Sequence, residues 1–138
     1  MAGNFVLLLL MAGCSGESIP RDRVAVSGSV KLGDDYVDQA TVVFVPLNPS
    51  DGPKTSVTIE KGLFALPEEK GPLEGKHRVE IHPVGIELGE MTALVQEGKT
   101  ASVFATEIPR KYQQKFNGIT VDVVKGAENH FEWVLSQQ

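Results

Sequence analysis

The sequence has few of the residues that cross-link a chain, bind metals or attract nucleic acids. Cys14 is its single cysteine, so no intramolecular disulfide can form and no cysteine cluster can hold a metal. Lys and Arg number 13 against 18 Asp and Glu, which gives a formal net charge of −5 and no basic footprint for nucleic acid. The 138 residues, 41% of them hydrophobic, are enough for one globular domain.

Motifs of the common enzyme classes are also missing. The sequence has no GxSxG nucleophile elbow and no HExxH zinc motif. Residues 71–76, GPLEGK, are one residue short of a P-loop and lack the Ser or Thr that should follow it. The three histidines are far apart or, for His77 and His82, on opposite faces of one predicted strand. We therefore expect no catalytic activity, no metal and no cofactor.

The first residues have the pattern of an export signal. Residues 1–13 carry no charge, and their apolar run 5–11 is far shorter than the roughly 20 residues that a membrane-spanning helix needs. Residues 10–14, LMAGC, resemble a bacterial lipobox, which implies cleavage before Cys14 and a lipid on its sulfur. An ordinary secretory signal with an incidental cysteine is the alternative. We expect a signal peptide at 1–13, a tether at 14–22, a domain at 23–138, and anchoring of the exported protein to a membrane of the bacterial cell envelope through Cys14.

Residues 39–46, QATVVFVP, predict the central strand of the domain. Four consecutive apolar residues in a strand must be covered on both faces, and eight residues ended by Pro46 are too few for a typical buried helix. Alternating apolar residues predict further strands within 23–32, 55–59, 76–82, 119–123 and 131–135, and the tight turn 60–62 leads into another at 63–66. About seven short strands separated by Gly and Pro turns predict an all-β sandwich with Phe131 and Trp133 in its core.

Residues 84–114 have no such clear pattern. Leu88, Met91 and Val95 repeat at helical spacing but are interrupted by glycines, and 100–106 alternate weakly enough for an edge strand. We expect a poorly defined, mobile excursion before the last two strands.

The order and spacing of several short motifs resemble the carboxypeptidase regulatory-like domain of small bacterial lipoproteins. The motifs are 26–30 (VSGSV), 40–46 (ATVVFVP), 62–66 (GLFAL), 75–81 (GKHRVEI) and 108–112 (IPRKY). The resemblance implies a single transthyretin-like (prealbumin-like) Greek-key β-sandwich that serves as an accessory module without catalytic residues. His77 departs from the family pattern, which has an aromatic residue, usually tyrosine, at that position.

A small basic cluster stands out in this acidic chain: Arg110, Lys111 and Lys115 surround Tyr112. It is a possible contact patch for an acidic polymer or a partner protein. In the alternative interpretation, Ile108 and Tyr112 pin a loop onto the sandwich while the charges stay solvated.

Together these features predict a non-catalytic, lipid-anchored module of the cell envelope with a structural or protein-interaction role. The alternative is a small-ligand or carbohydrate-binding module that uses the loops at one end of the sandwich. The expected partners are the membrane, through Cys14, and an envelope protein or glycan, but not nucleic acid.

Overall fold

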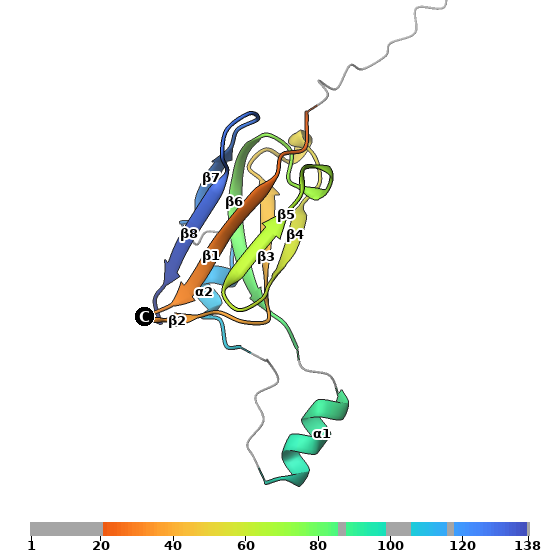
Figure 1. Cartoon of the computed structure of the whole chain (residues 1–138), viewed down its shortest axis with the longest axis vertical. Coiled ribbons are helices and arrows are strands. Elements are labelled where there is room, and N and C mark those ends of the chain that lie inside the picture. Colours follow the sequence, from red (N-terminus) through yellow and green to blue (C-terminus); the bar gives the residue numbers. More distant parts are fainter. Residues whose placement is uncertain (1–20, 86–87, 99–105, 116–117, 138) are drawn as a thin grey trace, which may run out of the picture.

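Two β-sheets pack face to face in the computed structural model, which describes residues 21–85, 88–98, 106–115 and 118–137 (Figure 1). The first sheet consists of β1 (Val26–Leu32), β2 (Asp35–Tyr36), β5 (Leu63–Leu66) and β8 (His130–Leu135). The second consists of β3 (Ala40–Pro46), β4 (Thr55–Ile59), β6 (Gly75–Pro83) and β7 (Thr120–Val123). The helices are α1 (Leu88–Gln96), α2 (Arg110–Gln113) and the 3-10 turns η1 (Pro49–Asp51) and η2 (Glu68–Lys70).

The first sheet is mixed and the second is antiparallel. β8 runs parallel to β1 along one edge, while β5 and β2 pair antiparallel with successive parts of the other edge of β1. The second sheet has the order β4-β3-β6-β7. This arrangement confirms the predicted all-β sandwich, with eight strands when the two-residue β2 is included. The resemblance to a transthyretin-like domain stays a prediction.

β3 is central, as predicted, because it pairs with β4 on one side and β6 on the other. Val42 and Phe44 point into the sandwich and are fully buried. On the outer face Val45 is buried and Val43 is half-buried, opposite Arg78 and Glu80 of β6. The alkyl parts of these two charged side chains supply apolar cover there.

An aromatic cluster joins the two sheets. The Phe44 ring of β3 lies 6.3 Å from that of Phe64 and 6.4 Å from those of Phe131 and Trp133, measured between ring centroids. Trp133 stacks on both Phe64 and Phe131, at 5.5 and 5.8 Å. The predicted placement of Phe131 and Trp133 on the inner face of β8 is therefore confirmed.

The described chain begins at one end of the sandwich, and α1 lies beyond the opposite end (Figure 1). At the first end Arg21 pairs with Asp51 at 3.0 Å, and Arg23 Nη1 donates to the Gly71 carbonyl at 2.9 Å. At the other end the helical spacing within 84–98 does form a helix, which includes Gly89. Of the possible edge strand at 100–106, residues 100–105 lie outside the described residues.

Candidate interaction surface

The predicted patch at Arg110, Lys111, Tyr112 and Lys115 divides between surface and core. The three cations are exposed, whereas Tyr112 and the nearby Ile108 are buried at the edge of the hydrophobic core. The backbone N–H of Ser136 donates to Tyr112 Oη at 2.7 Å. Tyr112 thus holds α2 against the end of β8, which is the arrangement that the alternative interpretation describes, while contact of the three cations with a partner stays a prediction.

Lys111 is placed by the same contact. Its ammonium lies 4.9 Å from the centroid of the Tyr112 ring and donates to Ser136 Oγ at 2.9 Å. Burial of Tyr112 disfavours the phenolate, but the hydrogen bonds with Ser136 and the charge of Lys111 outweigh burial, so the pKa of Tyr112 is lowered. A positive charge therefore lies at the end of β8.

His77 is a core residue on the inward face of β6, opposite to the face that carries His82. It is 2% exposed, its Nδ1 lies 3.0 Å from the Gly75 carbonyl, and its ring meets the Phe44 ring edge-on. Burial lowers the pKa of His77, against the opposing effect of the Gly75 hydrogen bond. The residue is therefore neutral at pH 7, and its position gives it a packing role.

The other two histidines lie on outer faces. His82 Nε2 is 3.1 Å from Glu80 Oε1 on the second sheet. His130 lies on the first sheet between Ser27 and Glu132: its Nδ1 is 2.9 Å from Ser27 Oγ, and its Nε2 is 3.6 Å from Glu132 Oε1. The parallel pairing of β1 with β8 creates this cluster, which sequence patterns had not indicated.

The Ser27–His130–Glu132 cluster has the residue types of a hydrolase triad but not its surroundings. An acyl-transfer site needs amide N–H groups aimed at the developing oxyanion. The Ser27 N–H instead donates to the Asn129 carbonyl at 3.0 Å, and Ser27 lies in a regular strand that is paired on both sides. We interpret the cluster as a polar contact across the sheet.

The register of the first sheet places nine side chains in three rows on its solvent side, which we call the outer face. From the end where the described chain begins, the rows are Ala65–Ser27–His130, Leu63–Ser29–Glu132 and Tyr36–Lys31–Val134. In the first two rows the central residue, on β1, is a serine, so only small side chains cover the middle of the sheet there. The exposed large apolar residues Leu63, Tyr36 and Val134 lie in the second and third rows.

Two contacts hold Tyr36 of the third row in place. The Tyr36 ring packs on the turn before β5, since a Cβ on Gly62 would lie 2.2 Å from Tyr36 Cδ1. Lys31 Nζ lies 4.6 Å from the centroid of the same ring. Fractional exposures of 58% for Tyr36, 60% for Leu63 and 71% for Val134 are high for side chains of this size. A cation thus lies among three exposed apolar groups.

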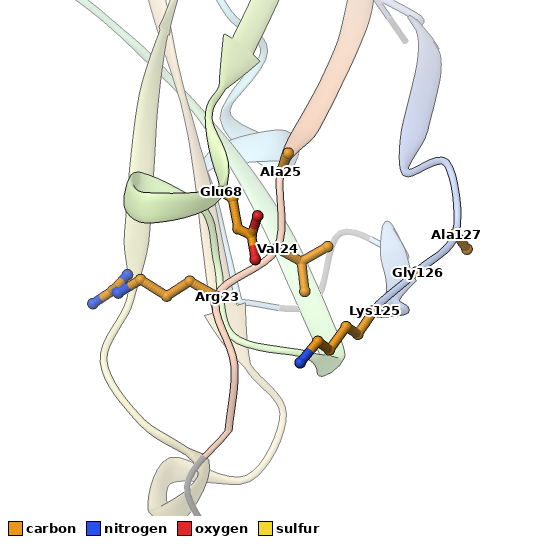
Figure 2. Close-up of a pocket in the computed structure, with 7 residues that line it drawn as sticks. All are labelled: Arg23, Val24, Ala25, Glu68, Lys125, Gly126 and Ala127. Atoms are coloured by element: carbon orange, nitrogen blue, oxygen red, sulfur yellow. The ribbon is translucent and has the colours of Figure 1, made fainter.

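Two adjoining pockets open beside the start of β1. One, of about 330 Å³, is lined by residues 23–25, Glu68 and the 125–127 turn, which includes Lys125 (Figure 2). The other, of about 410 Å³, lies between the end of β5 and residues 127–129 and is lined in part by Ser27. Lys125 pairs with Asp22, which raises the pKa of the lysine. Arg23 extends away from Lys125 in Figure 2.

Within the described ranges, no group of three or more His, Cys, Asp or Glu side chains could hold a metal ion. No helix in the part of the chain that the structure covers is long and apolar enough to cross a membrane. Cys14, the predicted lipidation site, lies outside the described residues.

No family model, curated protein or solved structure matches the chain.

Proposed function

We propose that the chain is a non-catalytic, lipid-anchored module of the bacterial cell envelope that binds a protein partner through the outer face of the first sheet. The observation that carries the proposal is the exposure of Tyr36, Leu63 and Val134 on that single face. Exposed large apolar side chains that gather on one surface are typical of interaction sites. Here they surround Lys31, so the face offers both apolar area and a charge that can select a partner.

The anchor in this proposal rests on the sequence around Cys14, which resembles a lipobox. The described chain begins at Arg21, at the end of the sandwich opposite α1 (Figure 1). A tether at that end would leave the outer face and α1 free to meet a partner. Replacing Cys14 with Ala should move the protein out of the membrane fraction, and unchanged partitioning would contradict the anchor.

Photo-crosslinking of the full chain in cells tests the binding face. A crosslinking amino acid at position 63 should give a discrete protein adduct, whereas one at Thr58, exposed on the outer side of the second sheet, should not. The variant Val134→Glu should abolish the adduct from position 63, and the matched variant Ser56→Glu should keep it. Equal labelling from positions 63 and 58 would overturn the proposed face.

A small-ligand module is the second candidate, favoured by the two pockets beside β1. Their volumes of about 330 and 410 Å³ fall within the range of ligand sites, and both are built from loops at one end of the sandwich. Ala127 lines both pockets, so Ala127→Phe should fill them. A compound that raises the melting temperature of the wild-type protein but not of Ala127→Phe would favour this candidate.

A further inference from the structure

α1 stands clear of the two sheets and makes no extensive contact with another helix or strand among the described residues. Met91, Leu94 and Val95 lie at i, i+3 and i+4, so their side chains share one face of the helix. Val95 is 62% exposed, whereas Met91 and Leu94 are half-buried. α1 lies apart from both sheets in Figure 1.

A helix of this length needs a surface to pack on. α1 has nine residues, one of them Gly89, whereas isolated helices shorter than about 12–15 residues are only marginally stable in water. Most helical stability in proteins comes from packing of an apolar face. We therefore expect the face formed by Met91, Leu94 and Val95 to be covered in the working state of the protein.

Charge narrows the choice of that surface. Residues 84–98 contain Glu87, Glu90 and Glu97 but no Lys or Arg. An acidic helix is repelled by anionic lipid headgroups, which attract basic segments. The surface that receives α1 should be apolar and carry positive charge.

The third row of the outer face has this chemistry. Lys31 lies between Tyr36 and Val134 in the sheet register, and Leu63 adjoins Tyr36 across the Gly62 turn. Lys111 adds a second cation at the end of β8, where it contacts Ser136. Among the nine side chains of the outer face the acidic one is Glu132, which lies 3.6 Å from His130 Nε2, while Asp34 and Asp35 are exposed at the turn between β1 and β2.

We propose that two copies of the chain associate reciprocally, with α1 of each copy packed on Tyr36, Leu63 and Val134 of the other and Glu90 next to Lys31. A helix of nine residues is about 13.5 Å long, and three strands span about 10 Å, so the two surfaces are similar in size. One such contact is smaller than the roughly 1,200 Å² of a specific interface, but the two-fold arrangement doubles it.

This inference rests on the proposed function, because it names the partner of the same face. Tethering of both copies to one membrane raises their effective concentration, which favours a weak reciprocal contact.

Photo-crosslinking from α1 in the full chain tests the proposal. A crosslinking amino acid at Val95 should give an adduct of twice the monomer mass, with the second site in β2, β5 or β8. The matched control is Gln96, which is exposed on the opposite side of the helix and should give at least tenfold less dimer.

Charge reversal then tests the register. Lys31→Glu alone and Glu90→Lys alone should each reduce the dimer about fivefold, and the two together should restore it. Because Glu90 and Lys31 are both at the surface, these variants should fold normally. No restoration in the double variant would overturn the assigned register.

The remaining outcomes separate this inference from the proposed function. A crosslink from Val95 within one chain, or no dimer above the Gln96 level, would overturn the reciprocal dimer. A Val95 adduct with a different protein would also overturn it, yet would leave the interaction module standing. If position 63 labels no more than position 58, both proposals fail.

Discussion

Gly28 and Phe64 lie directly opposite each other on the neighbouring strands β1 and β5, and the Phe64 ring fills the space that a side chain at position 28 would occupy. A Cβ on Gly28 would lie 2.6 Å from Phe64 Cζ and 2.0 Å from the Phe131 carbonyl oxygen. Gly28 is not among the residues with positive φ, so it is there for space. Its small size allows Phe64 to stack on Trp133.

Gly28→Ala should therefore destabilise the protein strongly. Phe64 could shift, but the Phe131 carbonyl belongs to a paired strand and cannot, so we expect a loss of about 3 kcal/mol in the free energy of unfolding. Urea denaturation measures this change. Gly89→Ala is the control: a Cβ there meets nothing within 4 Å, so the midpoint should not fall. Equal midpoints for the two variants would contradict the packing role of Gly28.

The strands were predictable because each has a local signal. In β6, for example, inward His77, Val79 and Ile81 alternate with outward charged residues, and this period of two is visible in the sequence. The pairing of β1 with β8 has no such signal. Ser27 and His130 are 103 residues apart, and no pattern in either segment indicates that the two strands pair. The outer face depends on that pairing, so sequence analysis could not find it.

The patch at Arg110, Lys111, Tyr112 and Lys115 was predicted from residue types alone. Residue types do not show which side chains are buried, and in the structure only the three cations are at the surface. The residue types around Tyr112 indicated a basic patch, but they do not show whether the Tyr112 ring itself is buried. The hydrogen bond from the Ser136 N–H to Tyr112 Oη decides that question, and it joins residues 24 positions apart. The pockets beside β1 likewise combine three separate segments of the chain.

Asp38 should stabilise the corner between the two sheets. Its Oδ1 accepts hydrogen bonds from the backbone N–H groups of Gln39, at 3.0 Å, and Lys61, at 2.8 Å. Both residues have positive φ, of 55° and 51°, which is unfavourable for residues other than glycine. Asp38→Ala should cost about 1–2 kcal/mol in the free energy of unfolding, measured with urea. Asp38→Asn, which keeps Oδ1, should recover most of the loss, and equal losses for the two variants would contradict the role of Oδ1.

The buried His77 should make stability depend on pH below neutrality. Burial lowers the pKa of His77 in the folded protein from its ordinary value of 6.5, so between the two values the unfolded chain binds more protons. Stability is then complete above pH 6.5 and decreases as the pH falls toward the lowered pKa. Urea midpoints at several pH values from 7.5 to 5 should show this decrease, and His77→Phe should flatten it. The control His82→Gln should keep it, because that side chain is on the outer face of the second sheet.

Tyr112 should ionise at a lower pH than an ordinary tyrosine. Burial raises the pKa of Tyr112, but the Ser136 hydrogen bonds and Lys111 lower it by more, so the pKa lies below the ordinary value of 10.0. The chain has two tyrosines, so Tyr36→Phe leaves Tyr112 as the single phenol that absorbance can follow. In that variant the phenolate signal should titrate with a midpoint below pH 10, and adding Lys111→Ala should raise the midpoint. The folded state loses its proton first, so this group adds stability as the pH rises through the lowered pKa. A midpoint at or above 10 in the folded protein would contradict the contact of Tyr112 with Lys111 and Ser136.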